Sequence, residues 1–197
     1  NYPQMLVLAP TRELALQVAE ALQTYARFMP NFHVLPVYGG QGMGHQLGQL
    51  RRGVEAVVGT PGRIMDHMRR GTLDISRLRA LVLDEADEML RMGFIDDVEW
   101  ILEQTPAHRQ IVLFSATMPK EIRKLSADHL DRPVEIAVTP ASTPVERIQQ
   151  SVMYVGSRGK PAVVAHLAHE HHGKRIIIFT RTKHGADRVV KSLDQAG

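Results

Sequence analysis

The chain contains no cysteine, which excludes a disulfide framework and any metal site built from thiolates. This absence fits a reducing cytosol, so we expect a cytoplasmic protein. No apolar run approaches the roughly 18 residues of a membrane span, and we expect neither a membrane segment nor a signal peptide. The formal net charge is only +3, from 24 Lys and Arg against 21 Asp and Glu. Because this excess is small, any basic surface that binds nucleic acid has to be local.

Along residues 1–138, short apolar runs alternate with segments of helical periodicity. A buried strand of a parallel sheet reads as such a run, because both of its faces are covered. The runs that predict strands are 5–9, 33–38, 55–59, 80–84, 111–115 and 134–138. Apolar residues spaced by three and four predict helices around 14–25, 47–50, 64–70, 94–102 and 122–130. Strands that alternate with helices predict an α/β fold with a parallel sheet.

Residues 139–144 read Thr-Pro-Ala-Ser-Thr-Pro and interrupt this alternation. The stretch has two prolines and no periodicity, so we expect an interdomain linker, which we extend over 139–149. The first domain is then 1–138, and we expect it to be truncated at its N-terminus. A strand begins there only a few residues in, with no initiator Met before it.

The remaining residues, 150–197, begin a second α/β unit. We expect strands at 151–155 and 175–180, and helices at 161–171 and from 183 onward. Two strands do not close a domain core, so we expect this second unit to be incomplete.

One apolar run ends abruptly in three carboxylates within four residues, Asp84, Glu85 and Asp87. In open α/β sheets ligands bind outside the carboxyl ends of the strands, so we expect these acids to face a crevice. Two adjacent acids are costly there unless a cation meets them. Mg²⁺ bound to a nucleotide phosphate suits them, because it prefers oxygen ligands and keeps most of its waters. The alternative is a strand followed by a solvated acidic turn.

Two other strand ends lead into helix starts that suit anions. Thr60 followed by Pro61 predicts a hydroxyl N-cap and a proline at the first helical position, and Thr11 can cap in the same way. A helix N-terminus offers free N–H groups and the positive end of the helix dipole. Arg12 and Arg63 make each start a seat for phosphate, and two seats on one edge suggest a polyanion backbone. The alternative is that both are simply well-capped helices.

Five short motifs occur in a characteristic order. They are Pro10-Thr11-Arg12-Glu13-Leu14-Ala15, Gly39-Gly40, Thr60-Pro61-Gly62-Arg63, Asp84-Glu85-Ala86-Asp87 and Ser115-Ala116-Thr117. In this order and spacing the chain resembles the DEAD-box ATP-dependent RNA helicases over nearly its whole length. The surrounding residues are most similar to the bacterial cold-shock and ribosome-assembly members. The resemblance implies a RecA-like parallel sheet flanked by helices, followed by the start of a second RecA-like domain.

The resemblance implies that ATP with Mg²⁺ is the cofactor, and it gives the acids separate roles. Asp84 would hold Mg²⁺, largely through water. Glu85 would orient and deprotonate the water that attacks the γ-phosphate. Asp87 would hydrogen-bond to the Ser115-Ala116-Thr117 segment and the second domain, so that the ATP state is coupled to strain in the RNA.

The resemblance further implies contacts to the sugar-phosphate backbone of one RNA strand. Such contacts carry little sequence information, so we expect sequence-independent binding, with 2′-hydroxyl groups favouring RNA over DNA. In the first domain the implied RNA-binding residues are Pro10, Thr11, Arg12, Gly39, Gly40, Thr60, Pro61, Gly62 and Arg63. In the second domain they are Phe179, Thr180 and Arg181.

The family also needs an adenine clamp, a phosphate loop and an arginine finger, which this sequence does not contain. Residues 39–46 have the glycine spacing of a phosphate loop, but His45 replaces its lysine and Gln46 its metal-binding hydroxyl. We therefore expect an RNA-facing glycine turn there.

Two hypotheses remain open from the sequence. In the first, the chain is part of an ATP-dependent RNA helicase that couples ATP binding and hydrolysis to local duplex separation or RNP remodelling. In the second, the chain as it stands is a non-catalytic fragment that binds RNA or docks a partner. No particular protein partner is indicated.

Overall fold

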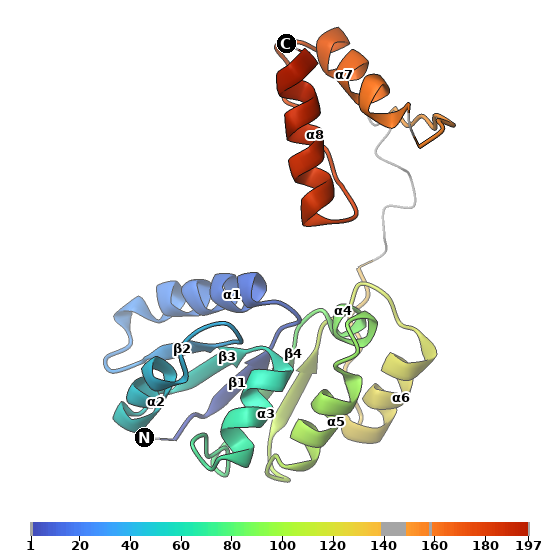
Figure 1. The fold of residues 1–197 in the computed structure, drawn as a ribbon. Helices are drawn as coiled ribbons and strands as arrows, with labels where there is room; N and C mark the ends of the chain where they lie inside the picture. Colours follow the sequence, from blue (N-terminus) through green and yellow to red (C-terminus); the bar gives the residue numbers. More distant parts are fainter. Residues whose placement is uncertain (1, 139–148, 158, 197) are drawn as a thin grey trace. The chain divides into compact units, whose positions relative to one another are not determined.

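The computed structural model describes residues 2–138, 149–157 and 159–196 (Figure 1). The chain divides into two compact units, Asn1–Glu135 and Ile136–Gly197, which we describe separately. The expected linker over 139–149 lies, apart from its last residue, outside the described residues.

A single parallel sheet organises the first unit (Figure 1). Its strands are β1 (Met5–Leu8), β2 (Val34–Val37), β3 (Ala56–Gly59), β4 (Ala80–Leu83) and β5 (Gln110–Leu113). Their spatial order is β2-β3-β1-β4-β5, and every neighbouring pair is parallel. The prediction of a parallel α/β sheet is confirmed, and these five strands start and end within a residue or two of the expected runs. All five carboxyl ends therefore lie along the same edge of the sheet.

Helices cover both faces of this sheet. They are α1 (Arg12–Tyr25), the 3₁₀ turn η1 (Ala26–Phe28), α2 (Met43–Arg52), α3 (Pro61–Arg69), α4 (Ala86–Arg91), α5 (Ile95–Glu103) and α6 (Lys120–His129). The five predicted helices of this unit are present. The short helix α4 and the turn η1 were not predicted.

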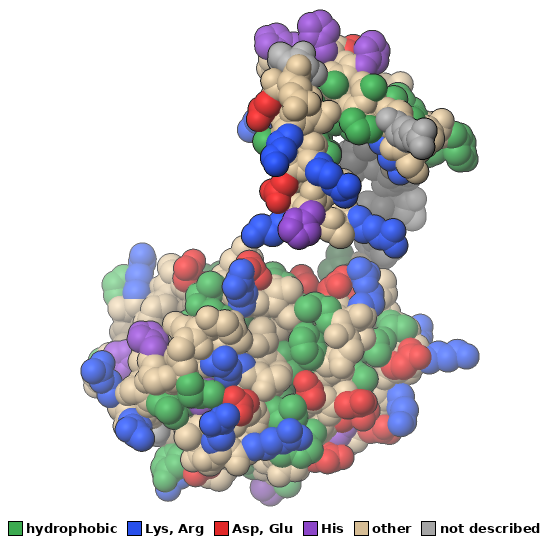
Figure 2. All heavy atoms as spheres, viewed as in Figure 1, with side chains coloured by type: hydrophobic (Ala, Val, Ile, Leu, Met, Phe, Trp, Pro, Cys, Tyr) green, Lys and Arg blue, Asp and Glu red, His purple; other side chains and the backbone are tan. Residues whose placement is uncertain are grey.

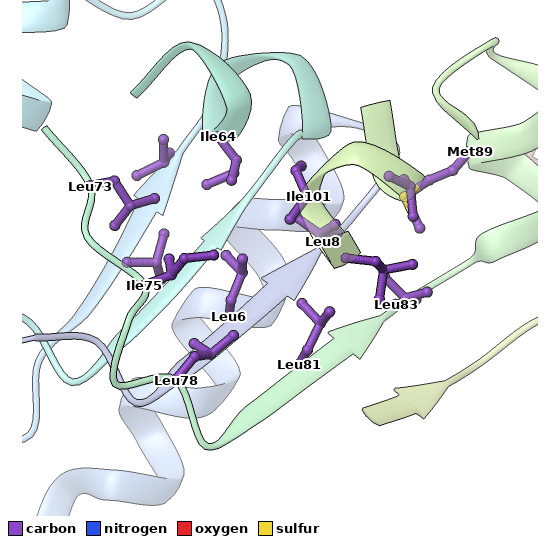
Figure 3. Close-up of a cluster of buried hydrophobic side chains, with 14 of the residues drawn as sticks. Leu6, Leu8, Ile64, Leu73, Ile75, Leu78, Leu81, Leu83, Met89 and Ile101 are labelled. Atoms are coloured by element: carbon purple, nitrogen blue, oxygen red, sulfur yellow. The ribbon is translucent and has the colours of Figure 1, made fainter. Parts of the chain in front are cut away.

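The alternation of side chains along β1 divides the core into two layers. Val7 and Ala9 face α1, where the small side chains of Ala15 and Ala19 allow the helix to pack closely on the sheet. Leu6 and Leu8 belong to the larger layer on the other face. Figure 3 shows this layer, in which side chains of β1 and β4 meet Ile64 of α3, Met89 of α4 and Ile101 of α5.

Three of the predicted strands are wrong. Residues 134–138, 151–155 and 175–180 are described, and none of them forms a strand. Val134, Ile136 and Val138 are each more than 80% exposed. An extended apolar run becomes a strand only when a neighbour accepts its backbone hydrogen bonds, and these runs have no such neighbour among the described residues.

The two helices predicted in the second unit are present, as α7 (Lys160–Glu170) and α8 (Lys183–Ala196). They pack against each other. Across the described residues, every helix is too short or too polar to cross a membrane.

Candidate functional site

Backbone hydrogen bonds tie the loops at the carboxyl edge of the sheet to one another. Ala9 N–H donates to the carbonyl of Gly59 at 3.0 Å, and Thr60 N–H donates to that of Val37 at 3.1 Å. On the other side of β1, Asp84 N–H donates to the carbonyl of Leu8 at 2.9 Å. The structure therefore brings all five sequence motifs to one edge. Their spatial order is 39–40, 60–63, 10–12, 84–87 and 115–117.

Gly59 permits the close approach of elements at this edge. A Cβ atom on Gly59 would lie 2.2 Å from the carbonyl oxygen of Val37 and 2.7 Å from Cδ1 of Ile64. Both distances are too short for a methyl group at Gly59. Glycine at this place lets β2, β3 and α3 meet, and so sets the position of the loop at 60–63.

The acidic loop begins directly after β4. Asp84 and Glu85 are both partly exposed. Glu85 has φ 51° and ψ 54°, in the left-handed region that residues other than glycine seldom adopt. Ala86 N–H donates to the carbonyl of Phe114 at 3.0 Å, and buried Met89 anchors the following turn of α4 in the core. These contacts hold Glu85 in a strained conformation, a feature that clusters at functional sites.

Asp87 joins the acidic loop to the segment after β5. Its Oδ2 accepts hydrogen bonds from the hydroxyl of Thr117 at 2.7 Å and from the Thr117 N–H at 3.0 Å. Asp87 N–H donates to Oγ of Ser115 at 3.2 Å, and that hydroxyl donates to the Thr117 carbonyl at 2.7 Å. Donors that face the carboxylate, the Thr117 hydroxyl first, lower the pKa of Asp87 although its burial acts in the opposite direction. Asp87 is therefore an ionised carboxylate, 6% exposed, that is held by neutral donors.

On the other half of the edge, α1 begins as expected. Thr11 is its N-cap, and its hydroxyl accepts a hydrogen bond from the N–H of Leu14 at 3.2 Å. Arg12 follows, and its exposed guanidinium donates to Glu13 at 2.6 Å, which raises the pKa of Arg12 and lowers that of Glu13. Gly40 has φ 86°, and a Cβ there would lie 3.8 Å from Nη1 of Arg12. The glycine turn and the start of α1 are thus neighbours.

The prediction that the Thr60 hydroxyl caps α3 is wrong, although the helix begins where we expected. Thr60 is the N-cap residue and Pro61 occupies the first turn, but the Thr60 hydroxyl makes no capping hydrogen bond. Its carbonyl instead accepts from the N–H groups of Arg63 and Ile64, each at 3.1 Å. The backbone alone closes this first turn.

The Arg63 side chain is held partly within the protein. Its Nη1 donates to the carbonyl of Gln41 and to Oε1 of Gln46, each at 3.1 Å. Gln46, which we expected in an RNA-facing turn over 39–46, instead lies in α2, and its partner His67 was not singled out from the sequence; both side chains are completely buried. A signal was present, because Gln46 lies four residues before Leu50 and His67 three residues after Ile64, on the faces of their helices that pack on the core.

The acidic loop is compatible with Mg²⁺ but does not form a protein cage for it. Among the described residues, no three His, Asp or Glu side chains gather as a metal site. Asp84 and Glu85 offer two partly exposed carboxylates at a strand end. This donor set fits Mg²⁺, which proteins usually hold through one or two carboxylates together with water and substrate phosphates.

The three residues expected from the second domain are described only within their own unit. Phe179 is 90% exposed, and Arg181 is exposed. Oγ1 of Thr180 donates to the carbonyl of Thr182 at 2.9 Å, just before α8 begins.

Lys and Arg side chains are interspersed with acidic ones on the face of the first unit drawn in Figure 2, without a single large basic patch. An open parallel sheet with acids and helix N-termini gathered at its carboxyl edge defines an α/β domain of the class that binds phosphate ligands there.

Comparisons with known proteins identify the family. Residues 1–125 match the family described as DEAD/DEAH box helicase. The chain is 49% identical over 195 residues to the ATP-dependent RNA helicase DeaD of Mycobacterium tuberculosis, covering 99% of this chain and 34% of that protein. It is 50% identical over 196 residues to the ATP-dependent RNA helicase DeaD of Escherichia coli, covering 99% and 31%.

Solved structures agree with this assignment. A DEAD box protein from Methanococcus jannaschii matches with a TM-score of 0.66 and 36% identity, over 100% of this chain and 52% of that chain. A hypothetical ATP-dependent RNA helicase from Sulfolobus tokodaii matches with a TM-score of 0.62 and 44% identity, over 66% and 39%. The chain belongs to the DEAD/DEAH box helicase family, and its sheet is RecA-like. It spans 34% and 31% of the length of the two DeaD relatives.

Proposed function

We propose that this chain is part of an ATP-dependent RNA helicase that couples ATP binding and hydrolysis to local RNA duplex separation or RNP remodelling. The division of the sheet edge is the observation that carries the proposal. The acidic loop and its hydrogen-bonded neighbour follow β4 and β5, whereas the glycine turn and the two arginine-bearing helix starts follow β2, β3 and β1. One edge thus offers an acidic half for Mg²⁺ and ATP and a half rich in N–H groups and arginine for an RNA backbone.

On the acidic half, Asp84 would hold Mg²⁺, mainly through water, and the ion would neutralise phosphate charge. Glu85 would orient the attacking water and accept its proton. Phosphoryl transfer depends chiefly on positioning and charge stabilisation, so two carboxylates with these separate tasks suffice on this side of the site. The left-handed conformation of Glu85 sets the direction in which its Cα–Cβ bond leaves the backbone.

On the other half, the first two N–H groups of α1 and the Gly62 N–H of α3 can donate to a phosphate, since Pro61 has no N–H and the next N–H groups of α3 already bond to Thr60. Arg12 is exposed, and among the described residues the Arg63 side chain donates hydrogen bonds only through Nη1, so both guanidinium groups can donate to phosphate. The RNA-binding set is Pro10, Thr11, Arg12, Gly39, Gly40, Thr60, Pro61, Gly62 and Arg63. Contacts of this kind position the strand without reading its bases.

We assign residues 1–138 to the first RecA-like helicase domain, 139–149 to the linker and 150–197 to the start of a second RecA-like domain. Phe179, Thr180 and Arg181 would reach RNA from that second domain. The pairing of Asp87 with Ser115 and Thr117, and the backbone of Ala116 between them, would transmit the ATP state toward it. ATP and RNA as ligands are consistent with a cytoplasmic protein.

Replacement of one carboxylate in the full-length natural protein that carries this chain tests the proposal. Glu85→Gln keeps the shape of the side chain but removes the base, so RNA-stimulated ATP hydrolysis should fall at least 100-fold, roughly the contribution of a general base, while ATP binding persists. Glu88→Gln is the matched control, because Glu88 lies in the short helix that follows Glu85 and pairs with exposed Arg91. Normal turnover in Glu85→Gln would remove Glu85 from this role.

A second candidate concerns the 197 residues alone. Among the described residues, neither Asp84 nor Glu85 has a cationic partner, and the glycine turn with phosphate-loop spacing lies on the RNA half, not beside the acids. This chain by itself would then be a non-catalytic RNA-binding or partner-docking fragment. An ATPase assay on the 197-residue chain separates the candidates, because hydrolysis by it would exclude the fragment role.

A further inference from the structure

A buried polar cluster lies directly beneath the glycine turn. Its central residues, Gln46 of α2 and His67 of α3, are each 0% exposed. With Gln41 and Arg63 they form a network that we call the amide clamp. Buried polar side chains persist in a core only when they are hydrogen-bonded, so the pattern of their partners shows what such a cluster holds.

The side-chain amide of Gln46 uses every hydrogen-bonding position that it has. Its Nε2 donates to the carbonyl of Tyr38 at 3.1 Å and to Oε1 of Gln41 at 2.8 Å. Its Oε1 accepts from Nη1 of Arg63 at 3.1 Å and from Nε2 of His67 at 2.9 Å. A carbonyl only accepts and a guanidinium only donates, so Tyr38 and Arg63 fix which end of the amide is the oxygen.

The partner of His67 on its other side completes the network. Since Gln46 Oε1 is an acceptor, Nε2 of His67 carries the proton. Nδ1 lies 2.9 Å from the hydroxyl of Thr72, whose single proton also lies within reach of the His67 carbonyl at 3.0 Å. Burial, and then the charge of Arg63, lower the pKa of His67, so the neutral imidazole with its proton on Nε2 is the stable form.

The amide clamp contacts the chain on both sides of the glycine turn. Tyr38 and Gln41 stand immediately before and after Gly39 and Gly40, and Gln46 bonds to both. In the described part of the chain, nothing lies within 4 Å of a Cβ built on Gly39, and only Arg12 lies that close to one on Gly40. Glycines have wide conformational freedom, so packing at the turn itself does not fix its shape. The clamp fixes both ends of the turn and joins them to Arg63 at the start of α3.

We infer that Gln46 and His67 are positioning residues for RNA, which preset the spacing between the Gly39-Gly40 turn and the start of α3. This inference rests on the proposed function, because the two elements are the ones assigned to the RNA backbone. Neither side chain reaches the surface, so neither touches RNA. They act by holding the donors of the turn and Arg63 in the arrangement that a phosphate backbone fits, which removes an ordering step from binding.

Gln46→Met in the full-length natural protein tests this role. Methionine has a similar volume but makes none of the four hydrogen bonds. The apparent Kd for a single-stranded RNA oligonucleotide should rise roughly tenfold, equivalent to one or two lost hydrogen bonds. The RNA concentration for half-maximal ATP hydrolysis should rise equally, with kcat at saturating RNA kept within about twofold. Without RNA, amide hydrogen exchange should accelerate across residues 38–42.

Thr105→Val is the matched control for lost stability. The Thr105 side chain is also buried and donates one hydrogen bond, to the carbonyl of Leu102 at 2.6 Å, outside the clamp. It should lower the melting temperature and leave the RNA Kd and the exchange at 38–42 unchanged. A purely structural role for Gln46 would make Gln46→Met behave in the same way.

Should Gln46→Met fail to fold, Gln41→Ala removes a single bond of the clamp from a partly exposed position, and RNA affinity should fall roughly threefold. If the unaltered protein binds RNA while the folded variants bind it equally well, with unchanged exchange at 38–42, the positioning role is wrong and the proposed function stands. If the unaltered protein binds no RNA, the proposed function fails first and the inference with it.

Discussion

The carboxylate of Asp87 accepts two hydrogen bonds from a single residue, Thr117, which lies 30 positions along the chain. The bonds join the turn after β4 to the turn after β5, so they fix the two loops of the acidic half against each other. Because both donors are uncharged, the carboxylate keeps its charge in a nearly buried place without a salt bridge to any residue that the structure describes. A substitution in either loop should therefore also change the conformation or stability of the other.

Removal of the Thr117 hydroxyl should destabilise the first unit. Thr117→Val keeps the side-chain shape and the backbone N–H but loses the 2.7 Å bond to an ionised acceptor, so unfolding should become easier by about 1.5 kcal/mol. Urea unfolding of the 197-residue chain, followed by the fluorescence of Trp100 in α5, measures this change. Thr24→Val is the control, since the exposed Thr24 hydroxyl donates only to a carbonyl of its own helix. Equal losses in both variants would contradict the special role of Asp87.

The same contact predicts a dependence of stability on pH. The folded pKa of Asp87 is lowered, so its contribution is complete above the unfolded pKa of about 4 and is lost as the pH falls through the folded value. The difference in unfolding free energy between the unaltered chain and Asp87→Asn should be constant near neutral pH and shrink below about pH 4. Urea unfolding at several pH values from neutral to acid measures it. A difference that stayed constant into the acid range would show that the carboxylate titrates normally.

A methyl group at Gly59 should disrupt the sheet edge. In Gly59→Ala the new Cβ would meet the Val37 carbonyl and Ile64, and backbone and core cannot both yield, so we expect a loss of about 3 kcal/mol. Gly48→Ala in α2 is the opposite case, because nothing lies within 4 Å of its Cβ and alanine favours a helix, which should stabilise by about 0.5–1 kcal/mol. Thermal or urea unfolding of both variants decides the matter, and a neutral Gly59→Ala would mean that β3 and α3 lie further apart.

The arrangement of the first sheet could be predicted from the sequence because its strands are apolar runs bounded by glycine, proline or charged residues. Parallel strands buried on both faces leave that pattern directly in the chain. The runs at 134–138 and 175–180 have the same composition, yet the described residues offer them no partner. Composition reports a tendency to extend, whereas a strand needs a neighbour that lies elsewhere in the chain.

The candidate site also has features that the sequence predicts and features that it does not. The parallel topology makes it possible to predict that Asp84 and Thr11 lie at a shared edge, because each follows a strand end. The left-handed backbone of Glu85 and the short helix after it depend on contacts with the loop after β5, which no local pattern encodes. The link between Gln46 and the helix that carries Arg63 and His67 could not be predicted, because those partners lie 17 and 21 residues further along the chain.

Salt dependence of RNA binding tests whether Arg12 meets a phosphate. Arg12 and Arg70 are both exposed arginines that pair with a nearby acid, Arg12 with Glu13 and Arg70 with Asp66. Only Arg12 lies at the carboxyl edge beside the glycine turn, whereas Arg70 follows the far end of α3.

Each phosphate that a protein neutralises on a single strand adds about 0.7 to the slope of log Kd against log salt concentration. Arg12→Gln should therefore weaken binding and lower that slope by about 0.7, and Arg70→Gln should leave it unchanged. Fluorescence anisotropy with a labelled single-stranded RNA at several salt concentrations gives both slopes. Equal slopes for the two variants would place the RNA away from the start of α1.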